Sequence, residues 1–268
     1  MNKFFLIFLI FLTNCSQSSP DKRINLIDEL NSNKFNNKTY TTSYFDVYSL
    51  EKIKNDKKLT IYIEGDGLAW ISRRKISTDP TPTNPLAFKL ALNDENENII
   101  YLARPCQYVS NDNCNKNIWT ISQYSTNVLK SYKEIINHLS KTYKEIHLVG
   151  YSGGAGIVMY LGTIENESVK TIRTVAGNIN HNELTKILNI SQLKKSINFY
   201  SIEKKLKRTP QIHYYGLKDI TVPNELHISY KKRNQDSNCI SVESVDKVSH
   251  NEGWLEFWKS NSNKIPSC

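Results

Sequence analysis

A serine stands between glycines in Gly150-Tyr151-Ser152-Gly153-Gly154, directly after the apolar run "HLV". The glycines of a G-x-S-x-G pattern permit a sharp turn between a strand and a helix, and that turn exposes the serine hydroxyl. A serine hydroxyl is a weak nucleophile at neutral pH, so it needs a base, an acid to orient that base, and N–H donors for an oxyanion. The segment therefore predicts a nucleophile at Ser152, with a serine in an ordinary glycine loop as the alternative.

Asp219 and His250 are the candidates for the acid and the base. Asp219 lies in "YYGLKDITVP", just beyond a predicted strand, and His250 follows the last predicted strand in "VDKVSHNEGW". Where the nucleophile sits on such a turn, the acid and the histidine follow it along the chain, each in a loop after a strand. His227 is the alternative base, but it lies on a predicted helix, where packing would set its side chain. A turn-forming aspartate is the alternative interpretation of Asp219. We expect Asp219 to orient His250, and His250 to take the proton of Ser152.

The oxyanion donors are expected to be backbone N–H groups. One follows the nucleophile, at Gly153, and the second comes from the loop after an earlier strand, in "IYIEGDGLAW". The N–H of Asp66 is the favoured second donor, with Gly67 as the neighbouring possibility. Because a carboxylate beside an oxyanion would be harmful, we expect the Asp66 side chain to point away or to hydrogen-bond within its loop.

Strands and helices alternate along the chain. Apolar or β-branched runs predict strands at "YFDVYSLEK", "LTIYIEG", "NIIYLA", "EIHLVG", "VKTIRTVAG", "QIHYYG" and "CISVESVDKV". Apolar residues at three- and four-residue spacing predict a helix over 125–138, and further helices are expected at "NPLAFKLAL", "GAGIVMYLGTI", "HISYKK" and "NEGWLEFWKS". This alternation predicts an α/β fold with a mostly parallel central sheet and helices on both faces.

The order of these motifs resembles the α/β-hydrolase superfamily from about residue 45 to residue 258. More closely, the chain is similar to a group of exported bacterial α/β-hydrolase lipoproteins, through "YIEGDGLAW", "DPTPTNPLA", "YLARPCQY", "HLVGYSGGAG", "TVAGNINH", "GLKDITVP" and "SHNEGW". The resemblance implies a Ser152-Asp219-His250 serine hydrolase, esterase-like or lipase-like, that acts on a small-molecule or lipid ester without a cofactor. It implies no particular substrate. A non-catalytic binding lipoprotein on the same fold, and a peptidase or amidase with the same triad, are the alternatives.

The first residues have the composition of an export signal. A basic start at Lys3 precedes an apolar run that ends at Leu12, too short to span a bilayer, and Leu12-Thr13-Asn14-Cys15 resembles a lipoprotein cleavage site. We predict a signal peptide over 1–15, lipid attachment at Cys15, and a polar tether with an N-terminal extension over 16–40. The hydrolase domain is then expected over 41–268, and 181–210 forms either a small cap or a plain helix pair. The protein would face the periplasm or the exterior, anchored in the bacterial cell envelope.

The remaining four cysteines are even in number, as expected in an oxidising compartment. They allow three pairings. We favour Cys106 with Cys114, which closes a short loop, and Cys239 with Cys268. No CxxC pair or HExxH motif is present, so the sequence predicts no metal site.

The formal net charge is +9, but the lysines are scattered among polar residues rather than gathered in one run. No nucleic-acid-binding motif accompanies them, so we expect a solvated surface and no nucleic-acid partner.

Overall fold

The computed structural model describes residues 20–268. The predicted signal peptide and Cys15 lie outside the described residues. Among the residues that are described, no helix has the length and apolar character needed to cross a membrane.

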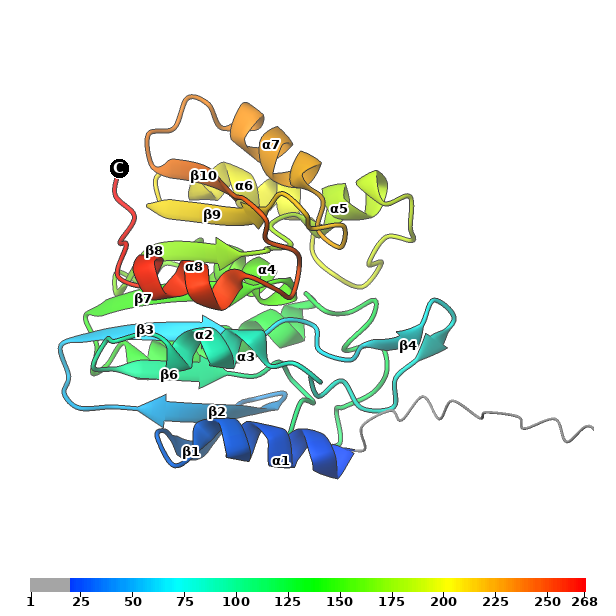
Figure 1. Ribbon diagram of the computed structural model, residues 1–268, viewed down its shortest axis with the longest axis vertical. Coiled ribbons are helices and arrows are strands. Elements are labelled where there is room, and N and C mark those ends of the chain that lie inside the picture. Colours follow the sequence, from blue (N-terminus) through cyan, green and yellow to red (C-terminus); the bar gives the residue numbers. More distant parts are fainter. Residues whose placement is uncertain (1–19) are drawn as a thin grey trace, which may run out of the picture.

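One eight-stranded sheet organises the chain, in the order β1-β2-β6-β3-β7-β8-β9-β10 (Figure 1). Its strands are β1 (Asn36–Thr41), β2 (Asp46–Lys52), β3 (Lys58–Ile63), β6 (Ile99–Leu102), β7 (Glu145–Tyr151), β8 (Val169–Val175), β9 (Gln211–Gly216) and β10 (Ile240–Val245). From β6 to β10 all neighbouring strands are parallel, whereas β2 is antiparallel to both β1 and β6. The mostly parallel sheet that the alternating pattern predicted is therefore present.

Helices cover both faces of the sheet. They are α1 (Pro20–Asn31), α2 (Leu86–Leu92), α3 (Thr126–Leu139), α4 (Gly153–Leu161), α5 (His181–Ile187), α6 (Phe199–Leu206), α7 (Asn224–Arg233) and α8 (Trp254–Asn261). One apolar core lies between the sheet and α3, α4 and α6, and a second lies between the sheet and α1, α2 and α8. Strands buried on both faces must be apolar throughout, which explains why β3, β6 and β7 are continuous apolar runs rather than alternating ones.

The folded domain begins earlier in the chain than expected. In the segment 16–40, predicted as a tether and extension, residues 20–31 form α1 and residues 36–41 form the edge strand β1. Ile27 of α1 is fully buried, and Tyr40 is the buried residue of β1. These side chains, with the buried Phe35, dock a largely polar segment onto the sheet.

Two disulfides join the four cysteines that the structure describes. Cys106 is bonded to Cys114, and Cys239 is bonded to the C-terminal Cys268. The second bond fastens the C-terminal segment beside the start of β10. Because disulfides persist in oxidising compartments, the two bonds indicate an extracellular or periplasmic protein.

Candidate active site

Ser152 lies on the turn between β7 and α4. Its backbone has φ 49° and ψ −118°, a conformation that L-residues rarely adopt and that marks strain stored at a functional position. Its N–H donates to the carbonyl of Val175 in β8, at 3.0 Å. A Cβ at Gly154 would lie 2.3 Å from the carbonyl oxygen of Ile63, so the turn can pack against the end of β3 because position 154 has no side chain. Contacts with both neighbouring strands, β8 and β3, thus keep the turn at Ser152 in this conformation.

The three residues predicted as nucleophile, base and acid form one hydrogen-bonded chain. His250 Nε2 lies 2.9 Å from Ser152 Oγ, and His250 Nδ1 lies 2.8 Å from Asp219 Oδ2. The other carboxylate oxygen of Asp219 accepts from the N–H groups of Thr221 and Val222, both at 2.9 Å. Both Asp219 oxygens are therefore engaged, which fixes the carboxylate and, through it, the imidazole.

The loop that carries His250 is held by aromatic side chains. The indole N–H of Trp254 donates to the carbonyls of Ser249 and His250, at 2.8 and 3.1 Å. The hydroxyl of Tyr151, the residue before the nucleophile, donates to Asn251 Oδ1 at 2.7 Å. The nucleophile turn and the histidine loop are thereby connected by a contact that sequence patterns did not predict.

The loop after β3 lies directly against Ser152. A Cβ at Gly65 would be 3.1 Å from the Cβ of Ser152. Within residues 20–268, neither the N–H of Asp66 nor that of Gly153 donates a hydrogen bond. Two backbone donors beside the nucleophile are thus left for a ligand, in the positions where the sequence predicted oxyanion donors.

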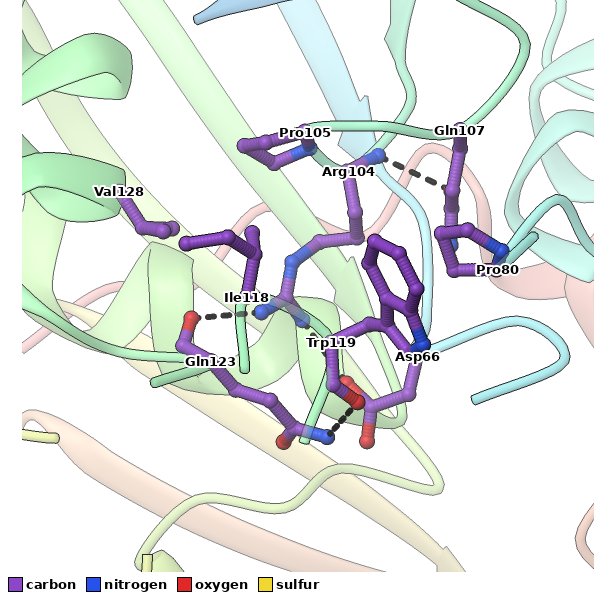
Figure 2. Close-up of a pocket in the computed structure, with 9 residues that line it drawn as sticks. All are labelled: Asp66, Pro80, Arg104, Pro105, Gln107, Ile118, Trp119, Gln123 and Val128. Carbon is purple, nitrogen blue, oxygen red and sulfur yellow. Dashed lines mark hydrogen bonds and ion pairs between the residues drawn. The ribbon is translucent and has the colours of Figure 1, made fainter. Parts of the chain in front are cut away.

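The Asp66 side chain does not lie where the sequence led us to expect. It points toward the turn at Ser152 and bonds outside its own loop. Its Oδ1 accepts from Arg104 Nη1 at 2.9 Å, and the same oxygen would be only 1.9 Å from a Cβ at Gly153. Figure 2 shows Arg104 extended between the Asp66 carboxylate and the carbonyl of Gln123, to which Nη2 donates at 2.7 Å. The correction has an electrostatic cause, because a buried guanidinium needs a counter-ion. Burial is the largest single influence and lowers the pKa of Arg104, but the Asp66 carboxylate together with Tyr124 and Tyr132 raises that pKa above its ordinary value.

Glu64 is a second buried carboxyl group that sequence patterns did not assign a role. It accepts from the N–H of Gly65 at 2.8 Å and from the Tyr101 hydroxyl at 3.2 Å, and it lies near the N–H of Ala87 in α2. Burial raises its pKa from 4.5 to about 7, although these donors oppose the rise. Glu64 therefore connects the loop after β3 with α2 and β6 through hydrogen bonds. The one sequence signal was an acidic residue ending an otherwise apolar strand.

Two other buried histidines, His227 and His213, make contacts within the protein core. Burial lowers the pKa of His227 to about 4, and the ring stacks on Tyr215 with centroids 5.1 Å apart. Burial likewise lowers the pKa of His213 to about 3, and its Nδ1 is 2.8 Å from Thr174 Oγ1. The alternative base, His227, therefore has no hydrogen bond to Ser152, and no group of three or more metal-ligating side chains occurs within 20–268.

The segment 181–210 forms α5 and α6, joined by the connection 188–198. Arg233 of α7 binds Glu183 of α5 at 2.5 Å and Glu203 of α6 at 2.9 Å. Phe199 of α6 is fully buried, and its ring packs on that of Tyr124. These contacts attach both helices to the body of the fold, while Ile190 in the connection is exposed.

Comparison with known proteins identifies the fold. No protein-family model and no curated protein matches the sequence. Solved structures do match: a Pyrococcus furiosus esterase (14% identity, 92% of this chain and 93% of that one, TM-score 0.60) and Est1E of Butyrivibrio proteoclasticus (10%, 84% and 94%, 0.61). A third is an α/β serine hydrolase homologue from Coxiella burnetii (15%, 84% and 94%, 0.57). The chain therefore has the α/β-hydrolase fold, and at these identities the likeness concerns the fold alone.

Proposed function

We propose that the protein is an exported serine hydrolase that cleaves carboxylic esters. The observation that carries the proposal is the unbroken hydrogen-bond chain from Asp219 Oδ2 through both ring nitrogens of His250 to Ser152 Oγ. A fold alone hosts many chemistries, and the proposal is supported by three side chains of the types that serve as nucleophile, base and orienting acid lying within hydrogen-bonding distance of one another.

In the proposed reaction, Ser152 Oγ attacks the ester carbonyl while His250 Nε2 takes the hydroxyl proton. The tetrahedral oxyanion accepts hydrogen bonds from the N–H groups of Gly153 and Asp66. His250 returns the proton to the leaving alcohol, and an acyl group remains on Ser152. Water, deprotonated by His250, then attacks the acyl carbonyl, the bond to Ser152 Oγ breaks to release the acid, and His250 returns the proton to Ser152 Oγ. Asp219 stays ionised throughout and stabilises the imidazolium.

The Asp66–Arg104 ion pair supports this assignment of the oxyanion donors. A lone carboxylate next to the Gly153 backbone would repel the developing negative charge, but Arg104 lies 2.9 Å from that carboxylate and compensates it. The pair also fixes the loop whose N–H would donate. Arg104 is therefore a positioning residue that acts through Asp66.

We also propose that the chain is delivered to the bacterial cell envelope and anchored there by a lipid on Cys15. The apolar segment ending in Leu12-Thr13-Asn14-Cys15 supports this, and so do the two disulfides. Metabolic labelling with a radioactive fatty acid tests the anchor. Label is expected on the wild type and absent from Cys15→Ser, and label that persists in the variant would exclude Cys15 as the site.

Labelling with a fluorophosphonate probe tests the serine mechanism. We expect the wild type to be labelled and to hydrolyse p-nitrophenyl acetate, and Ser152→Ala to do neither. Ser260→Ala is the matched control, because Ser260 is an exposed serine on α8. Undiminished labelling of Ser152→Ala would overturn the proposal.

A substrate panel separates the ester hydrolase from the two alternatives. Short acyl esters, long acyl esters and peptide amides would be compared at equal enzyme concentration. Faster turnover of esters supports the proposal, whereas faster turnover of amides indicates a peptidase or amidase. No turnover of either class would favour a non-catalytic binding protein.

A further inference from the structure

Large apolar side chains are exposed beyond the carboxyl ends of the parallel strands, where the candidate active site lies; Leu217 after β9 is one, at 49% exposure, and three others are more widely spaced. Trp70 is 47% exposed, Ile190 is 57% exposed and Ile220 is 89% exposed. Each lies in a connection that leaves the carboxyl end of a parallel strand: β3, β8 and β9 respectively. The strand ends of this same edge also place Asp66, Ser152 and Asp219. Figure 1 shows β4 and α5 projecting beyond this edge. We call Trp70, Ile190 and Ile220 the apolar rim.

Positive charge accompanies the apolar rim. The hairpin of β4 (Trp70–Ser72) and β5 (Lys75–Ile76) carries Arg73, Arg74 and Lys75 and no acidic residue. The connection 188–198 around Ile190 carries Lys194 and Lys195, again without an acid. All five of these cationic residues are exposed. Exposed apolar residues interleaved with lysine and arginine are typical of surfaces that bind anionic membranes.

The start of the folded domain lies beside the same edge. Arg23, in the first turns of α1, binds the Asp79 carboxylate at 2.7 Å and the carbonyl of Thr81 at 2.7 Å. Between them, the carbonyl of Pro80 accepts from Leu68 N at 3.0 Å, two residues after Asp66. The first turns of α1 therefore lie next to the loop that follows β3. Cys15 is five residues before Pro20, which limits its distance from that point to about 18 Å.

We propose that the apolar rim docks onto an anionic lipid bilayer and that Ser152 takes its ester substrate from the lipids of that bilayer. The substrate class rests on the proposed hydrolase function, whereas the orientation does not. A lipid on Cys15 would hold one point of the chain at the membrane, and contacts from apolar and basic residues orient the domain on it. In this proposal the lipid anchor and the apolar rim both act at the carboxyl ends of the parallel strands, and the triad lies at the same ends.

Quenching of tryptophan emission measures the orientation. Trp119, Trp254 and Trp258 are buried, so Trp70 is the exposed tryptophan of the four in the chain. The lipidated full-length protein would be reconstituted into vesicles of phosphatidylglycerol and phosphatidylcholine, with and without brominated acyl chains. We expect bromine to quench the wild type and to have little effect on Trp70→Phe.

Ile53 provides the matched control for orientation. It is 42% exposed and lies just before β3, at the end of the sheet where the parallel strands begin. In a Trp70→Phe background, a tryptophan introduced by Ile53→Trp is expected to remain unquenched. Equal quenching at the two positions, or none at Trp70, would overturn the docking orientation.

Activity on two presentations of substrate tests the lipid source. The double variant Ile190→Ser with Ile220→Ser is expected to lose at least about tenfold in hydrolysis of a fluorogenic diacyl lipid in vesicles, because each side chain loses favourable burial. Its hydrolysis of p-nitrophenyl acetate should match the wild type, and Ile53→Ser should match it on both substrates. An equal rate on vesicles for the double variant and the wild type would overturn the lipid source.

These outcomes are distinguishable from failure of the hydrolase proposal. If no ester is cleaved and no probe labels Ser152, the proposed function fails, yet the quenching experiment still decides the orientation. If soluble esters are cleaved and Trp70 is not quenched, the hydrolase stands and the docking surface fails. Self-association through the rim instead of membrane binding would appear as dimers in light scattering without quenching, and would also overturn the proposal.

Discussion

We expect Glu64→Gln to raise the free energy of unfolding more at pH 8 than at pH 5. Burial raises the pKa of the Glu64 carboxyl from 4.5 to about 7 in the folded protein. Because the folded state holds this proton more tightly than the unfolded chain does, the stabilising contribution is complete below about pH 4.5. It is lost as the pH rises through about 7. Glutamine keeps the shape and the oxygen that accepts from Gly65, and it never acquires the charge.

The size of the effect follows from the two pKa values. A rise from 4.5 to about 7 corresponds to about 3 kcal/mol, at about 1.4 kcal/mol for each pKa unit. About 2 kcal/mol of this loss falls between pH 5 and pH 8. The stability of the variant minus that of the wild type should therefore increase by about 2 kcal/mol over that range.

The difference in stability between the two proteins is the informative quantity, because four buried histidines, His147, His181, His213 and His227, act in the opposite direction. The pKa of His213 is lowered to about 3 and that of His227 to about 4, so their contributions grow as the pH rises from about 4 to 6.5. They are present in both proteins and cancel in the subtraction.

Urea unfolding at pH 5, 6, 7 and 8, followed by tryptophan emission, supplies the measurement. Glu167→Gln is the control, because Glu167 is exposed and its substitution should give a difference that does not vary with pH. A difference for Glu64→Gln that stays constant within about 0.5 kcal/mol from pH 5 to pH 8 would refute the reasoning.

Three further substitutions examine the site and its scaffold. Asp219→Asn should lower kcat for ester hydrolysis by about 10⁴-fold without unfolding the protein, because the imidazole loses its orienting acceptor; retention of kcat would contradict this role. Gly153→Ala places a Cβ 1.9 Å from Asp66 Oδ1 and should lower kcat by at least about 100-fold, while near wild-type kcat would show that the loop yields freely. Removing the Cys239–Cys268 bond, which spans 29 positions, should lower the free energy of unfolding in urea by about 3–4 kcal/mol, and no change on double substitution to serine would exclude a stabilising role.

The spacing of the site residues could be predicted because each lies at a strand end. The mostly buried strands β7 and β9 locate the loops of Ser152 and Asp219. The loop of His250 follows the half-buried edge strand β10, whose β-branched residues gave the signal. The elbow glycines carry a second signal, since close backbone contacts exclude side chains. Once the strands are identified, His250 is separated from His227 by its place in a loop after the last strand, because His227 follows Asp219 as well but lies on a helix.

The N-terminal elements gave a much weaker signal. β1 buries one residue, Tyr40, and exposes the other five, so its sequence has the character of a polar extension. An edge strand paired on one side has no need of a continuous apolar run. α1 is fixed by Ile27 and by Arg23, whose partners at Asp79 and Thr81 are more than 50 positions away. No local pattern encodes such contacts.

The direction of the Asp66 side chain is set by Arg104, which lies outside the segment around Asp66. The prediction considered the loop alone, and in that setting a carboxylate beside the oxyanion donors has no compensation. Arg104, 38 positions along the chain, reaches the loop from the end of β6. Glu64 was missed for a related reason, because its burial depends on α2 and β6 closing over it. Pairings between distant buried polar groups are set by topology rather than by spacing.

The ion pair also explains why an acidic residue can occupy this oxyanion loop. Two like charges about 4 Å apart repel by about 4 kcal/mol at an effective dielectric constant of about 20, which equals the contribution of an entire oxyanion donor. An uncompensated Asp66 would therefore cancel the stabilisation that its own N–H provides. Arg104 offsets that repulsion, and the bond from Arg104 to Gln123 holds the guanidinium in place. In the proposed mechanism β3 leads to the oxyanion donor, β6 to the counter-ion and β7 to the nucleophile, and these three strands are adjacent and parallel, so their carboxyl ends bring the three groups together.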